Sequence, residues 1–193
     1  MPLEDARRWD ERYTTESRYR GRPEPREWLT IHESLLPPEG LALDVAMGLG
    51  QNAAYLLGRG ISTIGVDISG VALQKAIAYT PGLMLIQADL SFPPFSWRVS
   101  GIFDVILNFY FLDRDLWTLY ARWLKPGGLL FFETLTKTQR EYNPEMPPNY
   151  LLSPGELLHA FAGMETLDYR EGTHTGASDK PRASASLLAR KSV

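Results

Sequence analysis

The chain has 193 residues, of which 44% are hydrophobic and 22% charged, and its formal net charge at pH 7 is -3. These values are typical of a single globular domain, and the lack of cysteine excludes disulfides, thiolate metal sites and a thiol nucleophile. The first residues are charged and no apolar run approaches the length of a membrane span, so we expect an untargeted, cytoplasmic protein.

Residues 1–38 precede the first predicted strand and contain two amphipathic segments. The spacing of apolar residues predicts a short first helix with an aromatic face and a second helix that begins at Pro25. Trp9, Tyr13 and Tyr19 are compatible with a lid over a ligand and equally with packing on the body of the domain. Residues 1–28 hold seven arginines and seven acidic residues, so this charge is balanced and we expect no nucleic-acid partner.

Residues 41–67 predict a β-α-β unit with a ligand site at its top. Residues 41–45 and 61–66 are short apolar runs, as in strands that are buried on both faces. Residues 46–50 form a turn with little side-chain bulk, which lets backbone N–H groups approach a ligand before an alanine-rich helix begins. Asp67 follows the second strand, and ligands of open α/β sheets bind at such carboxyl ends.

Apolar runs and helical patterns continue to alternate after this unit, which predicts one domain with residues 1–38 as a helical lid segment and residues 39–193 as an α/β core. Further strands are expected at residues 83–87, 102–107, 129–133, 164–170 and 183–191, and further helices between residues 70 and 81, at 113–124 and from 153 to 163. Ile77 is expected on the inner side of its helix, and residues 125–128 as a turn before the strand that follows.

The glycine turn is compatible with two kinds of ligand. Gly48, Gly50 and Ala53 match the dinucleotide pattern G-x-G-x-x-G/A. Asp44 favours a ligand without phosphate, because a carboxylate at the strand end repels a pyrophosphate and attracts a cation. S-adenosylmethionine carries an ammonium, a sulfonium and a ribose diol but no phosphate. Asp44 also has a purely structural interpretation, since acidic residues commonly cap the turn or helix that follows.

The same residues resemble the first motif of the class I S-adenosylmethionine-dependent methyltransferases, an acid followed by glycines at alternate positions. Asp44, Gly48 and Gly50 match this motif. Ala46 stands where the family usually has its first glycine, and we expect this alanine to need a negative φ. Within the superfamily, the chain is most similar to small single-domain tellurite-resistance or thiopurine-methyltransferase-like proteins, over nearly its whole length.

This resemblance implies a doubly wound, Rossmann-like α/β sheet of seven strands, mostly parallel with one antiparallel C-terminal strand. It implies S-adenosyl-L-methionine as cofactor and S-adenosyl-L-homocysteine as product. Asp67 would bind the ribose hydroxyls, Asp89 the adenine amine and the Asn108 region the methionine end, although Asp89 alternatively holds a turn. The expected cofactor-binding residues are Asp44, Ala46, Gly48, Gly50, Asp67, Ile68, Asp89, Leu90, Asn108 and Trp9.

His174 and Arg182 are the candidate catalytic residues. They lie in the segment HTGASDKPRAS, which looks like the His-to-Arg segment near the substrate pocket of tellurite-resistance-type relatives. Such a pair can hold an oxyanion or carboxylate, with Arg as a fixed donor and His as an adjustable proton donor. Thr175 stands where those relatives can carry a second arginine, and a solvated loop is the alternative. The histidines lack metal-ligand spacing, so we expect no metal.

Three functions are compatible with the sequence. The first is methyl transfer to a small molecule, such as a chalcogen oxyanion, a thiol or another small anionic acceptor; this in-line displacement needs positioning more than a strong base. The second is a nicotinamide-dependent oxidoreductase, favoured by the glycine spacing alone. The third is a non-catalytic module that uses the cofactor fold as a sensor or scaffold. Residues 108–111 read NFYF and lack the N-P-P-Y signature of DNA amino-methyltransferases, which disfavours base methylation.

Overall fold

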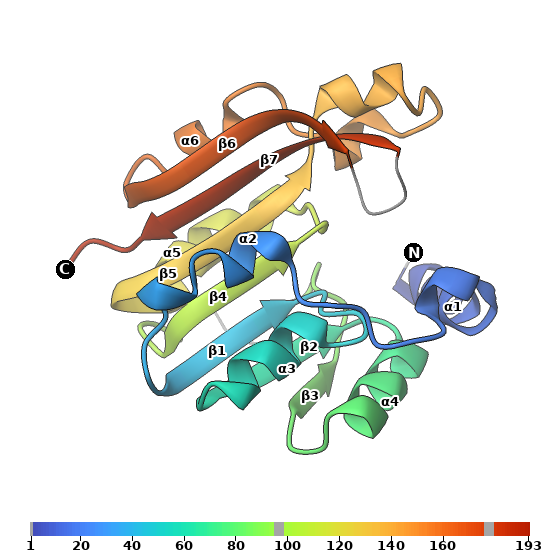
Figure 1. The fold of residues 1–193 in the computed structure, drawn as a ribbon, viewed down its shortest axis with the longest axis horizontal. Coiled ribbons are helices and arrows are strands. Elements are labelled where there is room, and N and C mark those ends of the chain that lie inside the picture. Colours follow the sequence, from blue (N-terminus) through green and yellow to red (C-terminus); the bar gives the residue numbers. More distant parts are fainter. Residues whose placement is uncertain (1, 95–98, 176–179) are drawn as a thin grey trace.

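A seven-stranded sheet runs through the computed structural model, which describes residues 2–94, 99–175 and 180–193 (Figure 1). The strands are β1 Gly40–Val45, β2 Ile61–Asp67, β3 Met84–Gln87, β4 Phe103–Phe109, β5 Leu124–Leu135, β6 Glu165–Thr175 and β7 Pro181–Arg190. Their order in the sheet is β3-β2-β1-β4-β5-β7-β6. β1 to β5 are parallel, and β7 is antiparallel to both of its neighbours. This confirms the predicted doubly wound sheet with one antiparallel C-terminal strand.

Helices cover both faces of the sheet. They are α1 Pro2–Thr15, α2 Glu27–Thr30, α3 Gln51–Gly58, α4 Gly70–Tyr79, α5 Trp117–Trp123 and α6 Glu156–Ala160. Single 3-10 turns cover Ser17–Tyr19, Glu33–Leu35, Arg114–Leu116, Lys137–Glu141 and Pro148–Tyr150. α2 and α3 lie over one face, α5 and α6 over the other, and α1 packs beside α4 near the end to which β1 points (Figure 1).

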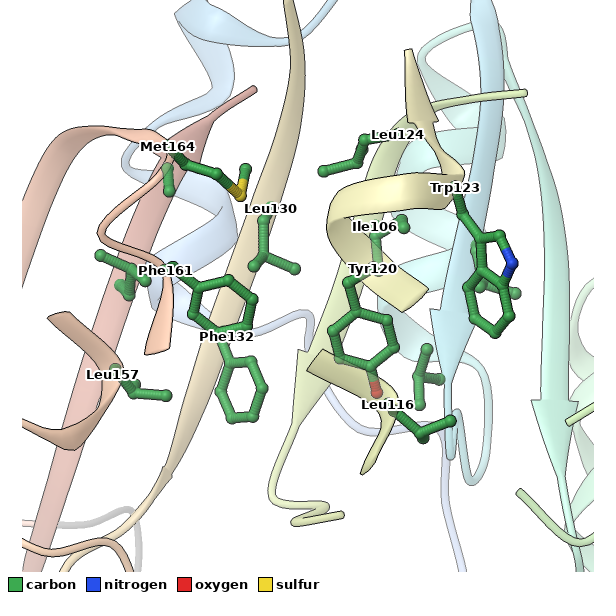
Figure 2. Packing of buried hydrophobic residues seen from close by; sticks show 14 of the residues in the cluster. Ile106, Leu116, Tyr120, Trp123, Leu124, Leu130, Phe132, Leu157, Phe161 and Met164 are labelled. Carbon is green, nitrogen blue, oxygen red and sulfur yellow. The ribbon is translucent and has the colours of Figure 1, made fainter. Parts of the chain in front are cut away.

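The core consists of two layers, because successive side chains of a strand point to opposite faces of the sheet. Ala42 and Val105 face the layer that contains Trp28 and Leu29 of α2. The neighbouring strand positions face the other layer, where aromatic rings from α5 and from the end of α6 surround the strands (Figure 2). The labelled members of this layer are Ile106, Leu116, Tyr120, Trp123, Leu124, Leu130, Phe132, Leu157, Phe161 and Met164. Full burial of one such large apolar side chain contributes roughly 1.5–3 kcal/mol.

Two helical expectations are wrong in detail. The second helix does not run unbroken from Pro25: α2 has a single turn, and His32 interrupts it with a non-helical backbone (φ -105, ψ 18) and places its Nδ1 2.8 Å from the carbonyl oxygen of Trp28. Ile77, expected on the inner side of α4, is 40% exposed, because Leu73 and Ala76 take the positions that face the core.

β5 begins five residues earlier than its apolar run, at Leu124. The expected turn at residues 125–128 continues the strand, because Gly127 donates a hydrogen bond to the carbonyl of Lys191 and the N–H of Lys191 donates to the carbonyl of Gly128, each at 2.9 Å. Among the helices within the described residues, none has the length and apolar character needed to cross a bilayer.

Candidate functional site

The turn after β1 places alternate residues in the left-handed region of backbone space. φ is +51 at Ala46, +58 at Gly48 and +73 at Gly50. The expectation of a negative φ at Ala46 is therefore wrong. The turn is tied to β2 by hydrogen bonds from Met47 N–H to the Val66 carbonyl (3.0 Å) and from Gly48 N–H to Asp67 Oδ2 (2.8 Å). The alanine accepts the left-handed conformation at a cost of about 1–2 kcal/mol.

The space around the two glycines of this turn is tight, in addition to their left-handed backbone angles. A Cβ atom added to Gly48 would lie 2.6 Å from the hydroxyl oxygen of Tyr13, and one added to Gly50 would lie 2.6 Å from Cε of Met47. The turn is thus a close approach of bare backbone to the side chains of Tyr13 and Met47.

Asp67 connects this turn to the start of α4. Its Oδ2 accepts from Gly48 N–H and its Oδ1 accepts from Ser69 N–H at 2.9 Å. Burial raises the pKa of Asp67, and the N–H groups of Ser69 and Gly48 act against that rise. A carboxylate has about four acceptor positions, so Asp67 keeps acceptor capacity for the hydroxyls of a ligand. Ile68 is half-buried beside it.

Asp44 makes the contact that the helix-capping interpretation predicts. It lies two residues after Ala42, on the same face of β1, and its Oδ2 accepts a hydrogen bond from the N–H of Ala53 in α3 at 3.1 Å. Burial raises the pKa of Asp44 to about 8, and the nearby charge of Arg26 opposes this. At neutral pH the free carboxyl group is therefore held largely in its neutral form. Direct contact with a cofactor stays a prediction.

Three other predicted cofactor residues have structural partners. Asn108 is buried on the α5 side of the sheet, where its Oδ1 accepts from the Tyr120 hydroxyl at 2.9 Å. Asp89 accepts from Ser91 N–H at 2.9 Å, so it holds a turn as the alternative interpretation states. Leu90 packs in the core layer beneath α5. Their predicted roles at the cofactor remain predictions.

The amino-terminal segment lies directly on the glycine turn. Tyr13 is buried against Leu49 of the turn, with the ring of Trp9 5.9 Å away. Asp10 accepts from Ser69 Oγ (2.6 Å) and from Val71 N–H (3.1 Å) at the start of α4. These contacts pack α1 on the turn, as the packing interpretation predicts, and a lid over a ligand stays a prediction.

Lys75 makes a second connection from α4 to this segment, donating to the carbonyl oxygens of Tyr13 and Tyr19. Burial, and then the charge of Asp67, raises the pKa of Tyr13. The phenol beside Gly48 therefore stays protonated and can only act as a neutral hydrogen-bonding group.

A second polar cluster lies at the carboxyl ends of β4 and β5. The hydroxyl of Tyr110 donates to Glu133 Oε1 at 2.5 Å, and Glu133 Oε2 accepts from Ser186 Oγ at 2.9 Å. Arg170 lies 3.8 Å from the same carboxylate. Neither Tyr110 nor Glu133 is among the site residues that the sequence predicts. A polar residue at the carboxyl end of an otherwise apolar strand was the available signal for Glu133.

The structure brings Arg182 to this cluster but leaves His174 outside it. The guanidinium carbon of Arg182 lies 4.9 Å from the centroid of the Tyr110 ring. His174 is the register partner of Arg182 on β6, and its side chain is exposed. Residues 176–179 of the predicted His-to-Arg segment lie outside the described residues. Within the described ranges, no three His, Asp or Glu side chains gather as metal ligands.

Hollows at the opposite end of the sheet offer no comparable site. One is lined by Glu39, Ser62, Asp104 and Lys125. Asp104 there is already paired with Lys125 at 2.8 Å and accepts from Leu41 N–H at 2.8 Å. The glycine turn and the Tyr110–Glu133 cluster lie instead at the carboxyl ends of the strands, where the α/β fold predicts a ligand site.

The turn fits the amino-acid and ribose parts of S-adenosylmethionine. Besides the acceptor capacity of Asp67, the side-chain oxygen of Gln51 is buried next to the turn without a hydrogen-bond partner. An ammonium group would supply the donor that this oxygen lacks.

The family comparison agrees with this geometry. Residues 42–128 match the model of a methyltransferase domain. This segment is the β-α-β unit, β3, β4 and the start of β5, so it contains the whole predicted cofactor turn. Over these residues the chain is thus similar to a methyltransferase domain, and the similarity includes the turn predicted to hold the cofactor.

Curated relatives include ubiquinone biosynthesis O-methyltransferases. That of Burkholderia multivorans is 28% identical over 122 residues, which are 60% of this chain and 52% of the relative. That of Nitrosococcus oceani is 30% identical over 123 residues, 60% of this chain and 51% of the relative. The chain spans about half the length of the curated relatives it matches.

Solved structures share the fold. TehB from Haemophilus influenzae superposes with a TM-score of 0.73 at 15% identity, covering 95% of this chain and 67% of TehB. A methyltransferase from Methanosarcina mazei gives a TM-score of 0.69 at 18% identity, covering 89% of this chain and all of that one.

Proposed function

We propose that the chain transfers a methyl group from S-adenosylmethionine to a small-molecule acceptor bound at the carboxyl ends of β4, β5 and β7. This proposal rests on one observation: the glycine turn and the Tyr110–Glu133 cluster are neighbours along one edge of the sheet. Val45, which precedes the cofactor turn, pairs with Asn108, two residues before Tyr110, and Glu133 pairs with Ser186 of β7. An acceptor beside Tyr110 would thus lie next to the cofactor turn.

The residues of the second cluster are suited to positioning. S-adenosylmethionine supplies a methyl group on a positively charged sulfur, and transfer forms a bond from this carbon to the acceptor as the carbon–sulfur bond breaks, leaving S-adenosylhomocysteine. Burial, and then Glu133, raises the pKa of Tyr110 to about 12, so this phenol is a donor at neutral pH and not a base. Orientation of two reactants supplies up to roughly 7–11 kcal/mol of barrier lowering in ideal cases.

Two classes of acceptor deserve the first tests. The curated relatives are named as O-methyltransferases, which favours an oxygen acceptor such as a hydroxyl group. The resemblance to tellurite-resistance-type proteins, together with Arg182 beside Tyr110, favours a chalcogen oxyanion, a thiol or another small anion.

Calorimetry with S-adenosylhomocysteine and, separately, NADH tests the cofactor part of the proposal. We expect S-adenosylhomocysteine to bind and NADH not to bind. Transfer of labelled methyl to a catechol, to selenite and to a small thiol then tests the reaction. Binding of NADH alone would support the oxidoreductase, and cofactor binding without transfer to any acceptor class would support a non-catalytic module.

A further inference from the structure

We propose that Arg26 and Arg182 form a binding site for the negatively charged group of the methyl acceptor, built around the ring of Tyr110. This inference rests on the proposed methyl transfer and specifies its acceptor as a small molecule with a carboxylate or a chalcogen oxyanion. Both groups present oxygen atoms with delocalised negative charge, which guanidinium groups bind by paired hydrogen bonds.

The two arginines converge on one side chain from distant parts of the chain. The guanidinium carbon of Arg26 lies 4.5 Å from the Tyr110 ring centroid, and that of Arg182 lies 4.9 Å from it. Arg26 immediately precedes α2, whereas Arg182 is near the start of β7. Two cations over one ring repel each other, and an anion bound between or beside them would remove that repulsion.

Neither arginine has a carboxylate partner among the described residues. Glu133, the carboxylate of this cluster, is shared by Tyr110, Ser186 and Arg170. Moreover, Nε of Arg26 is buried and makes no hydrogen bond. A buried donor without an acceptor costs about 1–3 kcal/mol, and more when the group is charged. An anionic ligand would supply this acceptor.

Tyr110 carries backbone strain at the same place. It has φ +59, a left-handed conformation that bulky residues rarely adopt. Its N–H donates to the carbonyl of Glu133 at 2.7 Å and its hydroxyl donates to the carboxylate of the same residue, so both ends of Tyr110 are held. Strain of this kind concentrates at binding sites, where the surrounding structure over-determines the conformation.

The position of Arg26 links this site to the cofactor turn. Its backbone N–H donates to Oδ1 of Asn52 in α3 at 2.9 Å, and its charge acts on Asp44 at the end of β1. An anion bound by Arg26 and Arg182 would therefore lie between the cofactor turn and the β7 end of the cluster. A neutral aromatic acceptor could accept a hydrogen bond from Nε of Arg26 but would bring no negative charge to the two guanidinium groups, so the geometry favours the anionic class.

The test measures anion binding by calorimetry with the full chain saturated with S-adenosylhomocysteine, so that no turnover takes place. The probes are sodium benzoate, sodium selenite and, as the neutral counterpart of benzoate, benzamide. We expect benzoate or selenite to bind and benzamide not to bind. Arg26→Gln and Arg182→Gln should each weaken binding of the anion about tenfold or more. Comparing the affinities for benzoate and selenite shows whether the site prefers a carboxylate or a chalcogen oxyanion.

Arg190→Gln is the matched control, because Arg190 is on the same strand as Arg182 and is paired with Glu165. This variant should change the affinity for the anion by no more than about twofold, because an exposed ion pair contributes little. Should Arg26→Gln fail to fold, Arg182→Gln, at a half-buried position, decides the outcome.

Absence of binding by both anions, equal binding of benzamide and benzoate, or unchanged anion binding in both Gln variants would overturn the proposal. Loss of S-adenosylhomocysteine binding in Arg26→Gln with anion binding retained would also overturn it, by assigning Arg26 to the cofactor. Failure of the wild-type chain to bind S-adenosylhomocysteine at all contradicts the proposed function itself, so the two failures are distinguishable.

Discussion

Asp67 at the end of β2 accepts a hydrogen bond from the backbone N–H of Gly48 at 2.8 Å, so one strand end fixes the turn that follows its neighbour. The other oxygen of Asp67 holds the N–H of Ser69 before α4. The carboxylate of Asp67 thus joins the glycine turn after β1 to the loop before α4, both of which face the predicted cofactor. It also holds the glycine turn in its left-handed conformation.

Asp67→Asn should weaken the binding of S-adenosylhomocysteine. An amide turns one acceptor into a donor that faces the N–H of Gly48 or Ser69, and it removes the charge. We expect a loss of roughly 10- to 100-fold in affinity, measured by calorimetry. The exposed Asp115 provides the control, since Asp115→Asn should change nothing. Equal affinities of the two variants would refute the role of Asp67.

Asp44→Asn should make the protein more stable relative to wild type as the pH rises. Burial raises the pKa of Asp44 to about 8, well above the unfolded value of about 4. Between these pH values the native state holds a proton that the unfolded chain releases. The contribution of this proton to the free energy of unfolding is therefore complete below about pH 4 and is lost as the pH rises through about 8. The loss is at most about 1.4 kcal/mol per pH unit.

Urea unfolding of both proteins at pH 5, 6.5 and 8 measures this difference. Asparagine keeps an oxygen for the N–H of Ala53 and does not titrate, so the stability gap between variant and wild type should widen in favour of the variant toward pH 8. Parallel pH profiles would show that the carboxyl group of Asp44 titrates as an ordinary exposed acid.

Gly48→Ala should destabilise the fold by roughly 1–3 kcal/mol, from the left-handed backbone and from overlap with Tyr13. Tyr13→Phe removes the hydroxyl oxygen that would lie 2.6 Å from the new methyl group, and the next ring atom is 3.6 Å away. The double variant should regain the stability lost to the steric overlap but not the stability lost to the left-handed backbone. A double-mutant cycle in urea detects this coupling, and strictly additive effects would argue against the contact.

Asp10→Ala should loosen α1 from the glycine turn while the sheet stays folded. The variant loses the acceptor for Ser69 Oγ and Val71 N–H, a cap of α4 worth about 0.5–2 kcal/mol. Trypsin should then cleave faster at Arg7, Arg8 and Arg12. Asp5→Ala removes only an exposed pair with Arg8 and serves as control. Cleavage at the same rate in both variants would mean that Asp10 does not hold the segment.

The sequence predicted the architecture well, because apolar runs, glycine turns and strand-end acids are local patterns. The β-α-β unit is confirmed to within one residue at its strand ends, and Asp67 lies at the end of β2 as expected. The same pattern did not show which way Asp44 faces. Asp44 lies on the same face of β1 as Ala42, which is the face that α3 covers. An acid at this position has the same sequence pattern whether it caps the helix or binds a ligand.

Contacts between distant segments were not predictable. Arg26, Tyr110 and Arg182 come together only when α2, β4 and β7 pack, and no local spacing links them. The same holds for Asp10 at the start of α4. Ala46 shows a different limit: its residue type argued for a negative φ, but hydrogen bonds from the turn to β2 impose the left-handed conformation.

A crystal structure of the chain with S-adenosylhomocysteine tests the central claim most directly. The account predicts the ribose hydroxyls on the carboxylate of Asp67, the glycine turn beneath the ligand, and the sulfur directed toward the end of β4 at Tyr110. A ligand bound elsewhere, with the turn closed by the chain's own atoms, would contradict it.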